Sequence, residues 1–335
     1  MDFEKLKIIL ANQPAFRLKQ AYMAIFKELR SAWSEVSTLP AGLRQELDRE
    51  CPLAINAQIE TTDDSRSAKA VITLADGEKI ESVLMKHANG RNTVCVSSQV
   101  GCPLGCTFCA TGQRGFSRNV TADEIVEQVL LFSRLLAKDD ERVGSIVFMG
   151  MGEPFLNYDS VLEAIRKIND PDRLGIGARH ISISTAGIVP GIERLTKEPL
   201  QVNLAVSLHA PTDELRRKIM PIGERYGIKE VLNATSNYIK KTNRRVMIEY
   251  VMLAGQNDTP DHAKKLAELL HGKLPPLFFV NVIVYNPTGF YQSSSSEAVS
   301  QFLSILEKYG ITAVERFRFA RGVKGACGQL AGRKK

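Results

Sequence analysis

The stretch GCPLGCTFC at residues 101–109 places three of the six cysteines of this chain in one short loop, with the spacing C-x3-C-x2-C. It follows residues 93–96, a run typical of a buried strand. Six cysteines among 335 residues are too few for a disulfide framework, so metal binding or redox chemistry is favoured. Three thiols at Cys102, Cys106 and Cys109 suit a [4Fe-4S] cluster with one iron left open. A zinc site completed by a distant fourth ligand stays an alternative.

Strand-like and amphipathic segments alternate along the chain after Arg91. Apolar strands joined by helices predict a parallel sheet with right-handed crossovers, either an open doubly wound sheet or a complete or partial barrel. The expected strands are residues 93–96, 145–149, 180–184, 202–208, 246–253, 278–284 and 313–319, and the expected helices include 122–136, 160–168, 229–240, 261–270 and 297–309.

Two smaller segments precede this core. Residues 1–55 carry apolar side chains at three- and four-residue spacings, which predicts a small helical domain. In residues 56–87, two extended runs flank Ala75–Glu78, a hairpin turn signal, and predict a hairpin linker. We therefore expect the core to span residues 88–321 and a C-terminal tail to span 322–335.

The composition is that of an ordinary globular protein, with 44% hydrophobic and 24% charged residues. No apolar run reaches the roughly 18 residues that a membrane span needs, and the polar start is unlike a secretory signal. A cytoplasmic protein is expected. The formal charge of +7 equals that of residues 316–335, which hold seven basic and no acidic residues. Such an end suits a polyanion such as nucleic acid, although a solubilising tail explains it equally well.

The cysteine loop resembles that of radical S-adenosylmethionine (SAM) enzymes, and the longer string Cys95–Gly112 is similar to the RNA adenosine methyltransferases of the RlmN/Cfr group. The resemblance covers Glu81 to Gly332. It implies an α/β fold, a partial (β/α)6 parallel barrel of radical SAM type, preceded by the helical domain and the hairpin. The further matching motifs are MGMGEP at 149–154, SISTAG at 182–187, SLHAP at 207–211, YNP at 285–287 and ACGQLAG at 326–332.

Each of these motifs sits where a predicted strand ends, which is where parallel sheets bind their ligands. Taken alone, the Gly-x-Gly at 150–152 equally indicates a tight turn, and His209 equally indicates a core histidine. The resemblance implies SAM contacts for seven residues. These are Gly152, Glu153, Ser184, Ser207, Leu208, His209 and Asn286.

Two cysteines outside the loop, together with the loop itself, make the resemblance to the RlmN/Cfr group more specific than the loop alone would. Cys327 lies between glycines in the basic tail, where Lys324 favours a thiolate. The resemblance implies that Cys327 carries the methyl group and that Cys95 is its resolving partner. It also implies that Glu81 accepts a proton, although a solvated strand residue explains Glu81 nearly as well. Cys51 is interpreted as a small buried hydrophobe.

The implied chemistry consumes two SAM molecules per turnover. One methylates Cys327, and the other is reductively cleaved to a 5′-deoxyadenosyl radical that activates this methyl group. The implied product is C2-methyladenosine in 23S rRNA and at the anticodon-adjacent position of tRNA, with a flavodoxin- or ferredoxin-type electron donor. Methylation of C8 of the same rRNA adenosine, as in the Cfr branch, is the alternative, because residues 16–20 and 201–204 lean toward that branch. A monomer that does not bind membranes is expected.

Two other classes fit less well. A radical SAM methylthiotransferase needs three more N-terminal cysteines for a second cluster, and only Cys51 and Cys95 precede the loop. A zinc-dependent RNA-binding module would not require glycine-rich strand ends.

The tail is about two residues shorter than in the resembling family, since only Val323–Gly325 separate Gly322 from the ACGQL motif. The position of Cys327 is therefore a question for the structure.

Overall fold

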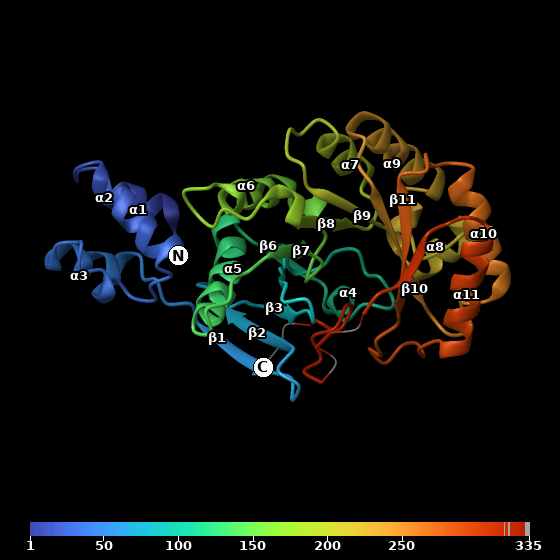
Figure 1. Cartoon of the computed structure of the whole chain (residues 1–335), viewed down its shortest axis with the longest axis horizontal. Coiled ribbons are helices and arrows are strands. Elements are labelled where there is room, and N and C mark those ends of the chain that lie inside the picture. The colour runs from blue at the N-terminus through green and yellow to red at the C-terminus, as the bar shows by residue number, and fades with distance from the viewer. Residues whose placement is uncertain (318, 321, 332–335) are drawn as a thin grey trace.

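The computed structural model describes residues 1–317, 319–320 and 322–331. Of the predicted basic tail, Arg318, Arg321 and the stretch 333–335 lie outside the described residues, as does Gly332 of the last motif. One sheet of ten strands forms the centre, in the order β1-β2-β3-β4-β7-β8-β9-β10-β11-β12, and a two-stranded sheet pairs β5 with β6 (Figure 1). The strands are β1 (Ala57–Thr61), β2 (Ser67–Thr73), β3 (Lys79–Lys86), β4 (Asn92–Cys95), β5 (Gln99–Gly101), β6 (Phe116–Asn119), β7 (Ser145–Phe148), β8 (Ile181–Thr185), β9 (Asn203–Ser207), β10 (Val246–Met252), β11 (Phe278–Val284) and β12 (Ala313–Glu315).

Within the ten-stranded sheet, the strands β4, β7, β8, β9, β10, β11 and β12 pair in parallel with one another, and helices connect most of them. This arrangement confirms the predicted partial parallel barrel. The physical reason is visible in β10 and β11, where six of the seven residues of each strand are buried, as expected for strands covered on both faces. The α-helices are α1 (Phe3–Leu10), α2 (Phe16–Tyr22), α3 (Ala41–Glu50), α4 (Ala110–Arg114), α5 (Ala122–Ala137), α6 (Tyr158–Asn169), α7 (Val189–Leu195), α8 (Asp213–Ile219), α9 (Ile228–Thr242), α10 (Pro260–His271) and α11 (Ser296–Lys308).

The helices that cover the sheet start at residues suited to a helix N-terminus. Thr121 and Glu124 form a reciprocal capping box at the start of α5. Thr259 caps α10 and is followed by Pro260 at the first helical position. These local signals explain why the sequence pattern located both helices to within one residue. No helix in the described part of the chain is long and apolar enough to cross a membrane.

The N-terminal helices form a lobe beside α5, at the far end of the molecule from α10 and α11 (Figure 1). Trp33 is fully buried in this lobe, and its indole N–H donates to the carbonyl of Cys51 at 2.7 Å. Cys51 is itself buried, as predicted, with its thiol directed at the carbonyl of Asp2. The N-terminal amine of Met1 pairs with Glu127 of α5, which ties the lobe to the barrel.

The hairpin joins the barrel as an antiparallel extension of its first strand. β2 and β3 pair around the predicted turn, and β3 pairs with β4 so that Val83 lies opposite Cys95. The sequence pattern did not predict β1, which adds a third antiparallel strand at the edge. The hairpin therefore lies beside Cys95, one of the two cysteines outside the loop on which the resemblance depends.

The last predicted strand is shorter than expected, because β12 ends at Glu315. The amide of Arg316 still donates to the carbonyl of Val282, but its side chain turns inward to Glu249. The ring of Phe317 then packs against Phe319. These side-chain contacts take the chain away from the sheet, whereas the apolar pattern of residues 313–319 predicted that it would continue.

Candidate active site

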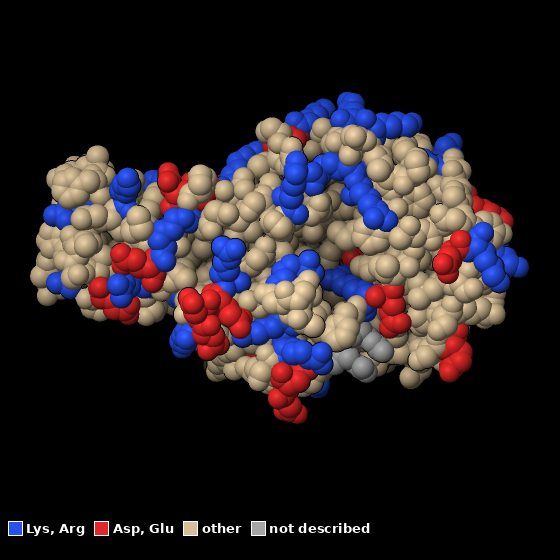
Figure 2. All heavy atoms as spheres, viewed as in Figure 1, with Lys and Arg blue, Asp and Glu red and all other residues tan. Residues whose placement is uncertain are grey.

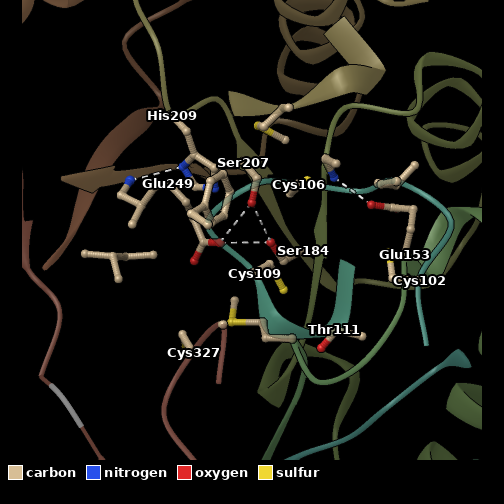
Figure 3. A pocket seen from close by; sticks show the side chains of 18 of the residues that line it. Cys102, Cys106, Cys109, Thr111, Glu153, Ser184, Ser207, His209, Glu249 and Cys327 are labelled. Carbon is tan, nitrogen blue, oxygen red and sulfur yellow. Dashed lines mark hydrogen bonds between the residues drawn. The ribbon is translucent and has the colours of Figure 1, made fainter. Parts of the chain in front are cut away.

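One cavity opens at the carboxyl ends of the parallel strands, and we name it the cofactor cavity. Side chains from the cysteine loop, from five strand ends and from the C-terminal segment converge on it (Figure 3). Nearly all of the residues predicted from the sequence to bind the cluster or SAM line it. They are Cys102, Cys106, Cys109, Gly152, Glu153, Ser184, Ser207, His209 and Asn286, together with Cys327.

The cysteine loop is held by main-chain contacts at both ends. Gly101 has a φ of 77°, and a Cβ there would lie 1.8 Å from the carbonyl oxygen of Gly115, so only glycine fits. The amide of Cys102 donates to that same carbonyl at 2.9 Å. Farther along the loop, the amide of Thr107 donates to the carbonyl of Ile219, the last residue of α8, at 3.0 Å. These main-chain contacts help to hold the loop that brings the three thiols to the cavity.

The three thiols suit a cluster better than a single ion. Zinc binds sulfur at about 2.3 Å, so its ligands must converge on one point. Among the described residues, no group of three or more His, Cys, Asp or Glu side chains converges in that way. Three thiols from one loop that line the same cavity fit a [4Fe-4S] cluster with one iron left open. Burial raises the pKa of Cys102 to about 12 and also raises the pKa of Cys106 well above its usual value, so cluster binding must displace protons.

Gly150 and Gly152 line the cofactor cavity, but their small size serves the protein itself. A Cβ on Gly150 would lie 2.6 Å from the carbonyl oxygen of Val96. A Cβ on Gly152, whose φ is 96°, would lie 2.5 Å from the Cβ of Gln99. The glycines therefore let the loop after β7 pack against the segment after β4.

Glu153 is a buried carboxylate that accepts two main-chain hydrogen bonds. Its two oxygens accept from the amides of Ala186, at 2.7 Å, and Phe155, at 3.0 Å. Burial nevertheless raises the pKa of Glu153 to about 7, because the loss of water outweighs these donors. A cationic group that enters the cavity would favour the ionised form. Glu153 is thus suited to meet an ammonium.

Ser184, Ser207 and Glu249 form a polar cluster in the cavity (Figure 3). The hydroxyl of Ser184 donates to Glu249 Oε2 at 2.9 Å, and that of Ser207 lies 3.4 Å from the same oxygen. The other oxygen, Oε1, accepts from Arg316 at 3.0 Å. Sequence reasoning missed Glu249, since a single glutamate within the strand IEYVML carries no motif. Its one signal is its charge inside an otherwise apolar strand.

The ring of His209 makes one hydrogen bond and one contact with the ring of Phe108. Its Nδ1 accepts from the amide of Val251 at 3.1 Å, and the two rings meet edge to face at 5.1 Å. Burial and the charge of Arg216 lower the pKa of His209 to about 3, so the ring is neutral. Leu208 differs from the other predicted contacts, because its side chain lies in the hydrophobic core and not in the cavity. Its backbone contacts the site instead: its carbonyl accepts from Arg216, and its amide donates to the carbonyl of Glu249 at 3.1 Å.

Arg216 holds the strand ends of the site together and was also missed from the sequence. Its fully buried guanidinium donates to the carbonyls of Ser207 at 2.9 Å, Leu208 at 2.7 Å and Ala186 at 2.5 Å. Burial lowers the pKa of Arg216 to about 10, which leaves it charged at neutral pH. The charge is thus spread over carbonyls from two neighbouring strand ends, which explains why a buried cation is tolerated without a carboxylate.

We expect Arg216→Met to lower the free energy of unfolding by about 3–5 kcal/mol, because three buried carbonyls lose their donor. The matched control is Arg217→Met, since Arg217 is 41% exposed and its guanidinium pairs with Glu224 at 3.5 Å on the surface. The control should change stability by less than about 0.5 kcal/mol. Urea unfolding of both variants measures the difference, and equal midpoints would show that Arg216 does not hold the strand ends.

A second, smaller cavity adjoins the first, and we name it the thiol cavity. Cys95 and Cys327 both line it, and Cys327 lines the cofactor cavity as well. The structure therefore brings the two specific cysteines together, although the tail is short. Burial raises the pKa of Cys95 to about 12; a negative charge on Cys327 adds to the rise, and Arg316 opposes it. Among the described residues, Arg316 is the cation that lines both cavities, whereas Lys324, which the sequence suggested, lines neither.

Main-chain hydrogen bonds fix the segment that carries Cys327. Its carbonyl accepts from the side-chain amide of Asn286 at 3.2 Å, and the carbonyl of Gly328 accepts from the amide of Ala110 at 2.8 Å. The hydroxyl of Thr111 donates to the carbonyl of Leu330. Since Ala110 and Thr111 begin α4, directly after Cys109, the segment rests on the helix that follows the cysteine loop.

Glu81 lies outside both cavities, beneath the C-terminal segment. Its Oε2 accepts from the amide of Ala331 at 2.9 Å, and its Oε1 lies 3.6 Å from the ammonium of Lys69. Both side chains are only 3% exposed. In this conformation the carboxylate anchors the tail.

The comparisons with known proteins agree with this fold and site. The family model of the radical SAM superfamily matches residues 96–270. The crystal structure of a radical SAM methyltransferase from Sphaerobacter thermophilus superimposes with a TM-score of 0.94, at 40% identity over 99% of this chain and 98% of that one. The partial barrel and its cysteine loop thus define a radical SAM protein, a class that implies a [4Fe-4S] cluster and SAM.

Comparison with curated proteins identifies a family within the radical SAM class. "Probable dual-specificity RNA methyltransferase RlmN" of Symbiobacterium thermophilum is 44% identical over 99% of this chain and 90% of its own length. "Ribosomal RNA large subunit methyltransferase N" of Nitrosopumilus maritimus is 39% identical over 98% and 95%. The chain belongs to the RlmN family of radical SAM RNA methyltransferases.

Proposed function

We propose that this protein methylates C2 of a specific adenosine in 23S rRNA, and of the anticodon-adjacent adenosine of tRNA, with Cys327 as the methyl carrier and Cys95 as the resolving thiol. The observation that carries the proposal is the position of Cys327, which lines both the cofactor cavity and the thiol cavity. A methyl group on its sulfur can thus face the cofactor on one side and a second thiol on the other.

The cofactors would be held by residues already described. Cys102, Cys106 and Cys109 would ligate the cluster, and the remaining predicted contacts would hold SAM, with Glu153 placed to meet its ammonium group. When bound, the cluster and SAM supply a reactive radical, which allows attack on electron-poor adenine carbons that direct methyl displacement does not reach. The protein's own contribution is to position these groups and to exclude water.

The two thiols would complete the reaction after the methyl carbon of Cys327 has joined the adenine. The sulfur of Cys95 would form a bond to the sulfur of Cys327, while the bond between that sulfur and the product carbon breaks and the carbon gains a proton. The resulting disulfide must be reduced by two electrons before the next turnover. Arg316 would assist, because its guanidinium lies beside both thiols and favours the thiolate of Cys95.

An RNA substrate suits the surface around the site. Lys and Arg side chains border the hollow at the centre of the face seen in Figure 2. Lys and Arg side chains around the hollow would attract the phosphates of an RNA backbone. The target adenosine must leave its base stack to enter a cavity, so loops of RNA are the expected substrates. We further propose that the protein acts in the cytoplasm as a monomer, reduced by a flavodoxin- or ferredoxin-type donor.

Nucleoside mass spectrometry tests this function. The protein is reconstituted anaerobically with iron and sulfide, then incubated with SAM, a reductant and either 23S rRNA or tRNA. We expect 2-methyladenosine in both RNAs, and none with Cys102→Ala, which cannot complete the cluster site. The appearance of 8-methyladenosine instead would support the Cfr-type alternative, for which residues 16–20 and 201–204 were the only signal. Unmodified adenosine in both RNAs would overturn the assignment.

A further inference from the structure

Phe317 is a large apolar side chain that the fold leaves in solvent, with 58% of its surface exposed. It is not isolated. Its ring meets Phe319 edge to face at 4.7 Å, and the guanidinium of Arg66 lies 5.6 Å from its centre. Phe319 packs in turn against His87, at 4.8 Å. We name Phe317, Phe319 and Arg66 the aromatic platform.

The two rings of the platform border the thiol cavity. Phe317 and Phe319 line that cavity together with Cys95 and Cys327. The same two rings also line a more open cavity on the other side, which Arg66 shares. A planar group that rests on Phe317 would therefore lie next to the space into which the target adenine must pass.

The chemistry of the platform fits an unpaired nucleobase. Aromatic rings and guanidinium planes are the surfaces on which single-stranded bases stack, and one such contact contributes about 1–3 kcal/mol. Arg66 is oriented by Asp64, whose carboxylate accepts from it at 2.7 Å. The other walls of the open cavity are mostly polar, including Thr62, Asp63 and Ser67. Such walls suit one flat ring with polar edges better than the continuous apolar face of a partner helix.

We propose that the aromatic platform stacks the base next to the target adenosine and so holds the target base out of its own stack, facing the thiols. This inference rests on the proposed function, because it concerns the same RNA. It adds residues outside the family motifs: Arg66 comes from the hairpin, and the two rings come from the stretch between β12 and the tail.

Fluorescence of 2-aminopurine tests the proposal locally, because stacking quenches this base. Two RNA hairpins carry 2-aminopurine on the 5′ or the 3′ side of the target adenosine. We expect the wild-type protein to quench one of the two, Phe317→Ala to lose that quenching, and Phe317→Trp to retain it. The kcat/KM of Phe317→Ala for RNA methylation should fall about 5- to 150-fold, which is the loss of one stacking contact.

Phe16→Ala is the matched control. Phe16 is 54% exposed, and the guanidinium of Arg17 lies 4.8 Å from its ring, so the chemistry is the same in the N-terminal lobe. This variant should leave the 2-aminopurine signal unchanged. Thermal unfolding and iron content verify that each variant is folded and loaded.

The outcomes separate this inference from the function on which it rests. Quenching at neither position, or equal quenching by Phe317→Ala and the wild type, overturns the platform while RNA methylation stands. A concentration-dependent dimer that Phe317→Ala disrupts, with unchanged fluorescence, would also overturn it and assign the ring to contact between copies. Absence of methyladenosine with the wild-type protein would instead overturn the proposed function itself.

Discussion

Replacement of Cys327 by alanine should reduce RNA methylation to background, while the protein keeps its iron–sulfur cluster and still cleaves SAM. The structure explains why the loss should be chemical and not structural. The segment around Cys327 is held by the carbonyls of Cys327, Gly328 and Leu330, and these bonds do not involve the thiol. Nucleoside mass spectrometry measures the product, and chromatography of 5′-deoxyadenosine measures the cleavage of SAM.

Cys51→Ala is the control for this experiment. Cys51 is also outside the cysteine loop, but it is buried in the core cluster near Trp33 and lines neither the cofactor cavity nor the thiol cavity. The control should lose about 1 kcal/mol of stability and no chemistry. Methylated RNA from Cys327→Ala would remove the methyl carrier from the mechanism, whereas loss of SAM cleavage in that variant would give the thiol a part in binding the cofactors.

Replacement of Cys95 by alanine should trap the protein on its RNA as a covalent adduct. Cys95 is the second thiol of the thiol cavity, so without it no sulfur can displace the product from Cys327. A denaturing gel should show a protein band of reduced mobility that ribonuclease treatment removes. Turnover should fall to background, because each molecule would react at most once.

The double variant Cys95→Ala/Cys327→Ala should show no such band, since the carrier of the adduct is missing. Free, methylated RNA released by Cys95→Ala would mean that another group resolves the intermediate. Unmodified RNA with no adduct would place Cys95 before the covalent step. Either result would contradict the resolving role.

The sequence predicted the elements well where the signal was local. The helices at α5 and α10 begin at capping residues, and the hairpin turns at the expected Ala75–Glu78. The β12 strand was predicted too long, because the inward turn of Arg316 depends on Glu249, a residue 67 positions earlier in the chain. Apolar periodicity carries no information about such a partner.

The same distinction runs through the site. The cysteine loop and the motifs at the strand ends were visible as short strings, and the structure places nearly all of them around one cavity. Glu249 and Arg216 were not visible, because each is an ordinary charged residue until the crossovers bring its strand or helix to the same edge. Leu208 shares a motif with its neighbours, but the alternation of side chains directs it into the core.

By itself, the sequence determined the class of chemistry: three closely spaced thiols, strand-end motifs and two further cysteines follow from residues near one another in the chain. Only the tertiary structure decided that Cys95 and Cys327 share a cavity, that Arg316 accompanies them, and that Glu81 anchors the tail. The physical reason is that short-range spacing controls local backbone shape. Cys95 and Cys327 are 232 positions apart, so whether their side chains meet depends on the order of the strands in the sheet and on where the tail packs.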